Sequence, residues 1–323
     1  MQILVTGGAG YIGSVIVHKL IKCNYKVIVI DNLQSGHKEY LPKNIKFYFG
    51  DIGNEDILND IFSQNNITHV IHCAAYADVN ESMINPIKYF DNNISKPIKL
   101  LNVMKLYECK NIIFSSTCAI YGTPQSLPLT ENSPKNPINT YGYTKLVFEQ
   151  MLEYMKQIHD FNVVVLRYFN VCGAYIDKDI DKYIIVGEDR NPETHLIPLA
   201  IKALIDNKSF NIYGTDYETK DGTCIRDYIH VEDLADAHIL ALGKQGTFNL
   251  GSENGYSVKE ILNLIQKICQ KELIINLCPR RPGDPPILYA NSNKFKNELE
   301  WTPKHDIESI IKSAYCWHKQ INN

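Results

Sequence analysis

The sequence lacks the patterns by which several common protein classes are recognised. It has no C-x-x-C pair, no H-E-x-x-H motif and no His-rich segment, so we expect no metal site. It has no run of basic residues and a formal net charge of −3, which argues against nucleic-acid binding. No apolar stretch is long enough to cross a bilayer, and there are no internal repeats or low-complexity segments. A globular protein without a nucleic-acid or membrane partner is the expected class.

The cysteines are also informative. There are nine of them, an odd number scattered along the 323 residues, which favours free thiols in a reducing compartment over a disulfide framework.

The first residues, MQILVTGG, already have the pattern of a strand, so we expect no signal peptide and a cytoplasmic location. A chain that is 45% hydrophobic and 21% charged can bury one large domain or two unequal ones.

The first half of the chain alternates short β-branched runs with helical patterns. Nearly continuous apolar runs are typical of parallel strands that are covered on both faces. Strand–helix alternation of this kind predicts an α/β fold with a doubly wound parallel (Rossmann) sheet. The expected strands are 2–6, 26–31, 45–50, 68–75, 111–116 and 162–170, and the expected helices include 11–23, 54–65 and 143–159.

The pattern changes after about residue 171. A polar loop over 173–195 leads to shorter elements, with helices expected near 196–206, 232–242, 258–270 and 306–319, a strand over 246–252 and a loop over 279–286. We therefore predict a large domain over residues 1–171, with a segment near 225–252 returning to its sheet. A smaller C-terminal lobe is predicted over 172–323.

A glycine-rich stretch, TGGAGYIG (6–13), follows the first strand and opens the first helix. Gly8, Gly10 and Gly13 have the spacing of a dinucleotide-binding turn, and Gly7 extends it. Such glycines let backbone N–H groups approach a pyrophosphate at the positive end of the helix. Asp31 ends the second strand, where its carboxylate would accept ribose hydroxyls and repel a 2′-phosphate. NAD is therefore predicted as the cofactor in preference to NADP.

Two further places along the sheet edge are candidates for cofactor contacts. Asp51 and Ile52, in GDI (50–52), would lie near the adenine, although the segment equally suits the start of the following helix. Ala74 and Ala75 end the fourth strand. Their small side chains would leave room for the cofactor, although ordinary packing explains them equally well.

The stretch TYGYTK (140–145) pairs a phenol with an ammonium. Tyr141 lies four residues before Lys145, about one helical turn, whereas Tyr143 would point elsewhere. A tyrosine has an unperturbed pKa of about 10, and a nearby ammonium and a cationic nicotinamide could lower it by roughly 2–3 units. Y-x-x-x-K alone is a common surface pair. After a nucleotide-binding turn, it predicts Tyr141 as the base and Lys145 as its activator.

FSSTCAIYG (114–122) places hydroxyls at the edge of the sheet where ligands bind in open α/β folds. Of Ser115, Ser116 and Thr117, we expect Thr117 to bridge Tyr141 and a substrate oxygen. Cys118 follows, but no His–Asp arrangement accompanies it, so it is interpreted as a bystander thiol.

Together these motifs resemble a known family along essentially the full chain. Several stretches are similar to the extended short-chain dehydrogenase/reductase superfamily: TGGAGYIG, DNLQSG (31–36), FSST with YG, YGYTK and RYFNVCGA (167–174). DGTCIRDYIHVEDLADAH (221–238) and RRPGD (280–284) resemble its UDP-glucose 4-epimerase family. The resemblance implies reversible inversion at C4 of a UDP-hexose through a 4-keto intermediate, with NAD retained and no net redox change.

The resemblance also implies site residues. Along the dinucleotide it implies Tyr11, Ile12, Asn32, Ser35, Asn92 and Phe169, with Lys145 also at the nicotinamide ribose. For the UDP-sugar it implies Asn170, His195, Leu196, Tyr213, Arg226, Arg281 and Asp284. A guanidinium meets phosphate oxygens with paired donors, so Arg226 and Arg281 are the expected pyrophosphate ligands. A homodimer is implied too, formed by the segments around 86–107 and 143–159.

Three positions depart from one form of the family. Ala77 stands where some members have a lysine near the cofactor, and Thr117 stands where others have serine. Leu288 falls where a tyrosine in some members restricts the pocket to sugars without an acetyl group. The sequence therefore suggests that UDP-N-acetylhexosamines are also accepted.

Other activities remain alternatives. UDP-glucuronate and UDP-xylose 4-epimerases share these motifs. A 4,6-dehydratase would need an acid–base pair directly after Thr117, where Cys118 and Ala119 stand instead. A non-catalytic NAD sensor would need the glycine turn but not Tyr141 and Lys145.

Overall fold

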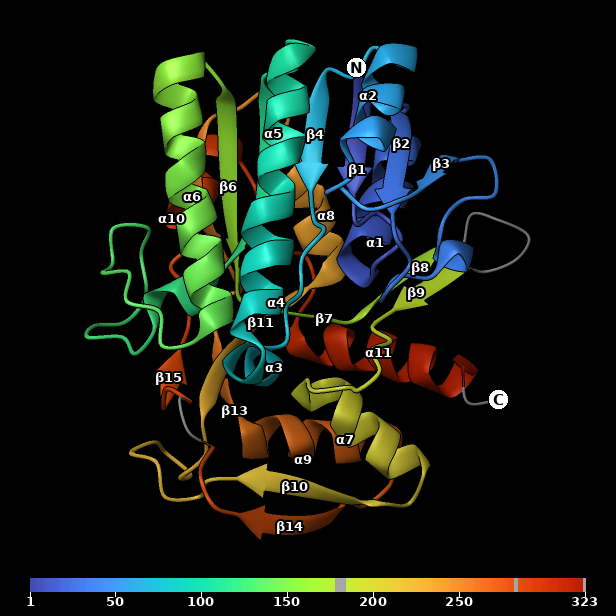
Figure 1. Ribbon diagram of the computed structural model, residues 1–323. Coiled ribbons are helices and arrows are strands. Elements are labelled where there is room, and N and C mark those ends of the chain that lie inside the picture. Colours follow the sequence, from blue (N-terminus) through green and yellow to red (C-terminus); the bar gives the residue numbers. More distant parts are fainter. Residues whose placement is uncertain (178–183, 282–283, 322–323) are drawn as a thin grey trace. The chain divides into compact units, whose positions relative to one another are not determined.

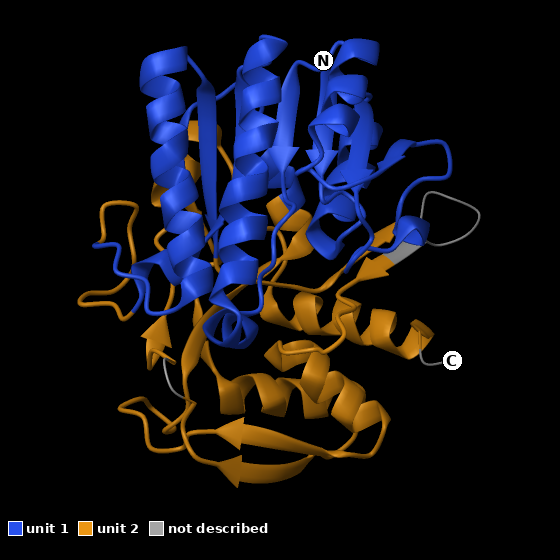
Figure 2. Cartoon of the chain, in the orientation of Figure 1, with its two compact units in different colours: residues 1–122, 134–168, 235–248 blue, residues 123–133, 169–234, 249–323 orange. Residues whose placement is uncertain are grey.

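The computed structural model describes residues 1–177, 184–281 and 284–321. The chain forms two compact units, coloured separately in Figure 2. The first contains residues 1–122, 134–168 and 235–248, and the second contains residues 123–133, 169–234 and 249–323. Each unit is thus assembled from segments that are far apart in the sequence.

The first unit is built on a seven-stranded sheet (Figure 1). Its strand order is β12-β6-β5-β4-β1-β2-β3, and the pairings that join β1 to β6 are parallel. The predicted doubly wound parallel sheet is confirmed. The strands are β1 (Gln2–Thr6), β2 (Lys26–Asp31), β3 (Lys46–Phe49), β4 (His69–His72), β5 (Asn111–Thr117), β6 (Asn162–Tyr168) and β12 (Gly246–Leu250), the last of which continues into the second unit.

Helices cover both faces of this sheet because each strand is apolar on both sides. On one face, Leu58, Leu100 and Phe148 of three helices pack against alternate strand residues such as Leu4 and Ile112. These helices are α2 (Glu55–Gln64), α5 (Lys96–Leu106) and α6 (Thr140–His159). On the other face lie α1 (Tyr11–Lys22) and the end of α8 (Val231–Leu240), joined by an ion pair between Lys19 and Asp236 at 3.0 Å. The remaining elements of the unit are η1 (Lys38–Tyr40), α3 (Val79–Ile84), α4 (Pro86–Phe90), η2 (Asp91–Ser95) and η3 (Cys118–Tyr121).

Local signals fix the helix boundaries that matter for the site. Asn139 caps α6 by accepting the backbone N–H of Gly142 at 2.8 Å, which begins the helix just before Tyr141. The helix ends where Asp160 adopts a left-handed conformation, φ 57°. The segment from α4 through the π-helical η2 to α5 runs from Pro86 to Leu106 without a break.

The second unit combines small sheets with helices. In one sheet β11 (Ile225–His230) pairs with β13 (Gly255–Ser257), β15 (Ile287–Leu288) and β7 (Asn170–Cys172). In another, β10 (Ser209–Tyr213) pairs in parallel with β14 (Ile274–Cys278). The helices α7 (Leu196–Ile205), α9 (Val258–Cys269) and α11 (Ile307–Ile321) bury a shared core that includes Leu204, Ile265 and Ile311, and α10 (Asn293–Leu299) completes the unit.

Two expectations about the middle of the chain were wrong. The strand predicted over 162–170 breaks at Phe169, since β6 pairs with β5 whereas β7 pairs with β11 of the second unit. The segment expected to be a loop over 173–195 contains an antiparallel pair, β8 (Ala174–Asp177) and β9 (Ile184–Gly187). The charged residues between these strands dominate the composition and mask two short apolar runs, AYID and IIVG. Most of the charged segment, 178–183, lies outside the described residues.

The other expected loop, 279–286, has no helix or strand at its described positions, and residues 282–283 lie outside them. The nine cysteines are free thiols. Among the described residues, the helices include none with the length and apolar character needed to span a membrane.

Candidate active site

The glycine turn at the carboxyl end of β1 is shaped for a close backbone approach. Gly7 has φ +67°, and a Cβ added there would lie 2.6 Å from the backbone nitrogen of Ala74. A Cβ added to Gly13 would lie 2.2 Å from the carbonyl oxygen of Gly7. Gly10 caps α1 without a side-chain hydrogen bond, and no acidic residue occupies the first turn. This turn fits the pyrophosphate of a dinucleotide, which uses backbone donors at a helix N-terminus. Tyr11 and Ile12 are half-buried in the same turn.

Asp31 connects this turn to the end of β2. Its Oδ2 accepts the backbone N–H of Ala9 at 2.9 Å and its Oδ1 accepts that of Leu33 at 2.8 Å. Burial raises the pKa of the Asp31 carboxyl above its ordinary value, although both backbone donors act in the opposite direction. A carboxylate at this position suits ribose hydroxyls, because their O–H groups would donate hydrogen bonds to an anion that has little contact with water.

A chain of polar contacts links three of the predicted cofactor residues. Asn32 Nδ2 donates to Asp51 Oδ2 at 3.1 Å, and Lys96 Nζ lies 2.8 Å from the same oxygen and 3.4 Å from Asn92 Oδ1. Partial burial acts to raise the pKa of Asp51, but the bonds from Lys96 and from the backbone N–H of Gly53 hold it below its ordinary value. Sequence reasoning missed Lys96, and no motif marks it.

The other predicted cofactor positions differ in exposure. Ile52 is buried, and its side chain packs into the core under α2, so only its backbone remains for a ligand. Ala74 packs partly against the same core, Ala75 is half-buried and Ser35 is exposed. Phe169 falls in the second unit, where it is buried and its N–H donates to Leu250 O at 3.1 Å.

Lys145 is a buried ammonium one turn after Tyr141. It is 4% exposed, its Nζ donates to the carbonyl oxygen of Ser115 at 2.8 Å, and it lies 6.0 Å from the ring centroid of Tyr141. Burial lowers the pKa of Lys145 to about 8, with Cys73 and Glu149 acting in the opposite direction. Tyr143 points elsewhere: it is 49% exposed, with its ring centroid 6.0 Å from that of Phe90.

The hydroxyls that end β5 have different partners. Ser115 Oγ accepts from the phenol of Tyr168 at 2.8 Å and donates to Cys73 Sγ at 3.3 Å. Thr117 Oγ1 accepts the backbone N–H of Ala119 at 3.1 Å, which leaves its own O–H to donate to a ligand. Ser116 turns to the opposite face of the sheet and bonds to Glu149. Cys118 is half-buried at the start of η3.

The residues predicted to bind the UDP-sugar, apart from Thr117, lie in the second unit, where several are neighbours. Arg226 Nη2 lies 3.5 Å from Asp284 Oδ1, and the β11–β15 register places Arg226 opposite Leu288, which is buried. The Arg281 guanidinium carbon lies 3.9 Å from the ring centroid of Tyr213. The structure thus brings both predicted phosphate-binding arginines beside other predicted residues.

Three further residues of this set have local partners. Asn170 Nδ2 donates to the carbonyl oxygen of Asp227 at 2.9 Å. His195 is the N-cap residue of α7, directly before Leu196, and its Nδ1 lies 2.7 Å from Glu188 Oε1. The His195 contact holds the pKa of the buried Glu188 below its ordinary value, against the effect of burial. Sequence reasoning did not single out Glu188.

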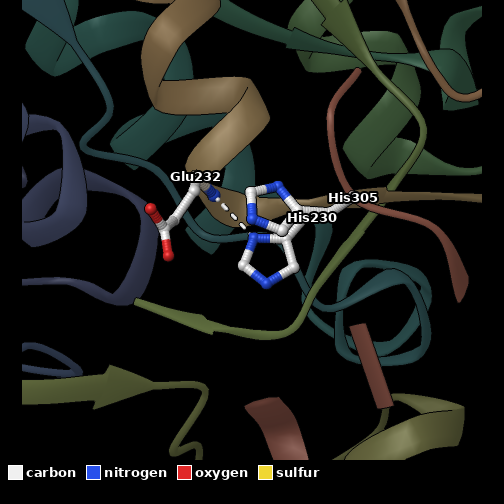
Figure 3. Close-up of side chains that lie close together, drawn as sticks. All are labelled: His230, Glu232 and His305. Atoms are coloured by element: carbon white, nitrogen blue, oxygen red, sulfur yellow. Dashed lines mark hydrogen bonds between the residues drawn. The ribbon is translucent and has the colours of Figure 1, made fainter. Parts of the chain in front are cut away.

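His230, Glu232 and His305 come close enough to suggest a metal site (Figure 3). However, the two imidazole rings stack with centroids 4.1 Å apart and an interplanar angle of 21°, so their in-plane lone pairs cannot converge on one ion. A Glu232 carboxylate oxygen lies within 4.8 Å of a nitrogen in each ring, but both nitrogens of His230 already have partners. Its Nδ1 accepts the backbone N–H of Glu232 at 3.1 Å, and its Nε2 lies 3.0 Å from Ser313 Oγ. His305 Nδ1 is bonded to Asp233 at 2.9 Å. The arrangement serves packing and helix capping.

Sequence reasoning also missed Glu149 and Arg167, which form a buried pair beneath Lys145. A signal for Glu149 was present, because Tyr141, Lys145 and Glu149 recur every four residues on α6 and so share one face. Arg167 lies within the quoted RYFNVCGA motif, but nothing in the sequence paired it with α6.

The chain resembles known proteins over nearly its whole length. The sequence pattern of the NAD dependent epimerase/dehydratase family matches residues 3–251. The chain is 44% identical over 327 residues to the UDP-glucose 4-epimerase of Lacticaseibacillus casei, covering 99% of this chain and 97% of that protein. Its fold is similar to that of the UDP-glucose 4-epimerase from Bifidobacterium longum in complex with NAD+ and UDP, with a TM-score of 0.93, 37% identity and coverage of 100% and 99%. It is also similar to the UDP-Glc/GlcNAc 4-epimerase from Campylobacter jejuni, with a TM-score of 0.84, 37% identity and coverage of 99% of each chain.

Proposed function

The chain belongs to the NAD dependent epimerase/dehydratase family, and from this we propose that it is an NAD-dependent enzyme that interconverts UDP-galactose and UDP-glucose. The reaction inverts C4 through a 4-keto intermediate. Relatives that are 40–45% identical over 98–100% of the chain are UDP-glucose 4-epimerases, which supports this substrate.

The single observation that carries the proposal is the buried Lys145 beside Tyr141. Burying an ammonium costs free energy that only hydrogen bonds or opposite charges offset, so a buried lysine is retained chiefly where its charge is used. Here it is anchored on Ser115 O and lies 6.0 Å from the Tyr141 ring, at the start of the helix that follows β5. The carboxyl edge of a parallel sheet is where ligands bind in this fold class. The pair is therefore suited to removing a proton from a substrate hydroxyl.

We assign the cofactor to the first unit. Gly7, Gly10 and Gly13 would face the pyrophosphate, and Asp31 would accept the adenosine ribose hydroxyls. When bound, NAD would supply a reversible acceptor for the C4 hydride. Lys145 would in addition hold the nicotinamide ribose by one of its three N–H donors, since the bond to Ser115 uses only one.

The proton step belongs to Tyr141. Its phenolate takes the proton of the 4-hydroxyl group, and the same phenol returns that proton once the sugar has presented its other face. Lys145 stabilises the phenolate by charge, and Thr117 donates a hydrogen bond that orients the 4-oxygen. The residues assigned to UDP are those of the second unit, above all Arg226 and Arg281, whose guanidinium groups suit a diphosphate.

We further propose that UDP-N-acetylhexosamines are accepted. Leu288 is aliphatic and buried on β15, beside Arg226 in the strand register, and offers less bulk than a tyrosine. A relative of known structure is a UDP-Glc/GlcNAc 4-epimerase. Wild-type protein should convert both UDP-galactose and UDP-GalNAc, and Leu288→Tyr should lose only the second activity. A wild type that converts UDP-galactose and leaves UDP-GalNAc untouched would refute the idea.

We propose a homodimer formed by the helices around 86–107 and 143–159. Large apolar side chains are exposed on these helices and on the neighbouring α3: Met83, Ile84, Ile87, Phe90, Leu106, Tyr143, Tyr154 and Ile158. Ile87 is 83% exposed, which is unusual for a monomer surface when its neighbours are apolar too. Light scattering should give a dimer mass for wild type and a monomer for Ile87→Glu. Ile274→Glu, at an exposed isoleucine of β14, is the matched control and should stay dimeric.

A cytoplasmic location is also proposed, supported by nine free thiols, which persist in reducing compartments.

The test uses purified protein with UDP-galactose and no added NAD, followed by NMR of the anomeric protons. UDP-glucose should appear, and the same equilibrium should be reached from UDP-glucose. Tyr141→Phe should lose nearly all turnover while still binding NAD. Tyr143→Phe, at an exposed position, should keep the turnover of wild type. If the protein fails with both sugars even when NAD is supplied, the assignment is wrong, and UDP-glucuronate and UDP-xylose become the next substrates to try.

A further inference from the structure

One buried ion pair lies next to the proposed proton-transfer residues and has no role in the reaction described so far. Glu149 and Arg167 have side chains that are 7% and 4% exposed. Arg167 Nε lies 3.1 Å from Glu149 Oε1, and Arg167 Nη2 lies 2.6 Å from Oε2, so the pair is bidentate. Arg167 Nη1 also donates to the Tyr121 phenol at 2.9 Å. The geometry fixes the Glu149 carboxylate in one orientation.

The helix α6 is hydrogen-bonded to β5 at two adjacent residues, Ser115 and Ser116. Ser116 Oγ donates a hydrogen bond to Glu149 Oε1. One turn earlier on α6, Lys145 Nζ donates to the carbonyl oxygen of Ser115, the preceding residue of β5. Thr117, the proposed hydroxyl donor, follows directly. The helix that carries Tyr141 is therefore bonded, at Ser115 and at Ser116, to the strand that carries Thr117.

The charge of Glu149 also bears on Lys145. Burial lowers the pKa of Lys145 to about 8, while Cys73 and Glu149 act to raise it. Burial raises the pKa of the Cys73 thiol to about 11, so this group is neutral near pH 7. His72 of β4 is neutral there as well, because burial and the Lys145 charge lower its pKa to about 3.

Two other titratable groups near Lys145 are phenols. Tyr141 is on α6 itself. Tyr168 of β6 reaches Ser115 Oγ, and burial raises its pKa well above the ordinary value, so it is neutral too. Of the groups named here, Glu149 is thus the one whose negative charge favours the ammonium form of Lys145 near neutral pH.

We propose that Glu149, oriented by Arg167, is a positioning residue for proton transfer at Tyr141. It holds Lys145 and Thr117 in register and keeps Lys145 charged. The catalytic importance of this role rests on the proposed epimerase function. The expected effect on the ionisation of Tyr141 does not depend on which substrate the protein uses. A purely structural ion pair would stabilise the unit without affecting the ionisation of Tyr141.

The first measurement is the ionisation of Tyr141, followed by tyrosinate absorption as the difference between each protein and its own Tyr141→Phe version. It is made on the protein with and without NAD and without any sugar. In Glu149→Gln the midpoint should rise by about one pH unit or more, because Lys145 loses its proton at lower pH. Ser116→Ala, which removes only the hydrogen bond from Ser116 to Glu149, should give a smaller rise. Glu153→Gln is the matched control, an exposed glutamate one turn further along α6, and should leave the midpoint unchanged.

The second measurement is turnover. Glu149→Gln should reduce kcat by roughly 10- to 100-fold with little change in KM, since a small displacement at a reacting group has effects of this size. The alkaline limb of its pH profile should move to lower pH. Glu149→Leu/Arg167→Met replaces the pair with apolar groups of similar size, which restores stability where a single substitution lowers it. This double variant should fold and unfold as the wild type does, yet keep the low kcat and the raised tyrosinate midpoint.

The outcomes separate the two proposals. If the double variant or Glu149→Gln folds and shows the wild-type midpoint and kcat, the positioning role is refuted. If the midpoints move as expected but wild type fails to epimerise UDP-galactose, the positioning role stands and the proposed substrate is wrong. If wild type epimerises and the midpoints do not move, the epimerase assignment stands and Glu149 is structural.

Discussion

Replacement of Lys145 by methionine removes the charge beside Tyr141 while keeping most of the side-chain volume. The size of the effect follows from the distance of 6.0 Å between Nζ and the Tyr141 ring centroid. With an effective dielectric constant of about 20, two unit charges at this separation interact by about 2.8 kcal/mol. This corresponds to about two pH units in the ionisation of the phenol, since one unit is worth about 1.4 kcal/mol.

The tyrosinate midpoint of Tyr141 should therefore rise by about two units in Lys145→Met, and kcat near neutral pH should fall by about 100-fold from this cause alone. Loss of the bond to Ser115 O should weaken activity further. The assay is the anomeric-proton NMR rate as a function of pH, with the tyrosinate titration alongside it. Part of the lost rate should return at high pH, where the phenolate forms without help.

Tyr143→Phe is the control, because Tyr143 lies on the same turn but is exposed. A Lys145→Met protein that folds, binds NAD and keeps the wild-type midpoint would refute the reasoning, since no dielectric constant suited to a buried site makes this charge negligible. A lowered rate with no recovery at high pH would show instead that Lys145 acts through ligand binding and not through the phenol.

Three other predictions concern different parts of the molecule. Asp31→Ser should weaken NAD binding by about 10- to 100-fold while improving NADP relative to NAD, since one charged acceptor is lost and a repulsive charge removed; isothermal titration with both dinucleotides measures this. Asp227→Asn should lower the free energy of unfolding, measured in urea, by about 2–4 kcal/mol. The Asp227 carboxylate accepts the backbone N–H groups of Ser252 at 2.7 Å and Ala290 at 3.0 Å, and in the variant an amide N–H group would lie against one of these donors. A variant as stable as wild type would contradict this. The pKa of Lys145 is about 8 in the folded protein and 10.5 ordinarily, so between these pH values the unfolded chain binds more protons than the folded protein. The free energy of unfolding of wild type, relative to that of Lys145→Met, should therefore rise with pH in this range, by up to about 3 kcal/mol. Unfolding curves at pH 7.5 and about pH 10 test the sign.

The fold of the first unit could be predicted from sequence because its signals are local. Runs such as KVIVID are apolar on both sides of the strand, and a helix must follow to cover them. The glycine turn and Asp31 were predictable for the same reason, since a strand, a tight turn and a helix follow one another within a few residues. The spacing of Tyr141 and Lys145 needed only the period of a helix.

What could not be predicted depends on residues far apart in the sequence. The strand over 162–170 looked continuous, yet Phe169 separates two strands that have different partners, and only those partners reveal the break. Lys96 contacts Asp51 across a gap of 45 residues, and Arg167 of β6 pairs with Glu149 of the helix α6. The pair β8–β9 was missed because a charged segment between two apolar runs has the composition of a loop.

The return of the chain to the first unit has a consequence for synthesis on the ribosome. The sheet is complete only when β12 pairs with β6, and β12 begins at Gly246, long after β6 ends at Tyr168. Until then the nascent chain presents β6 as an open edge, whose unpaired backbone groups attract other strands. A fragment that stops at residue 171 would keep this edge permanently, so it should aggregate where the full chain does not. The two units are thus interdependent in the order of their assembly, because about half of the second unit must be translated before the first can close.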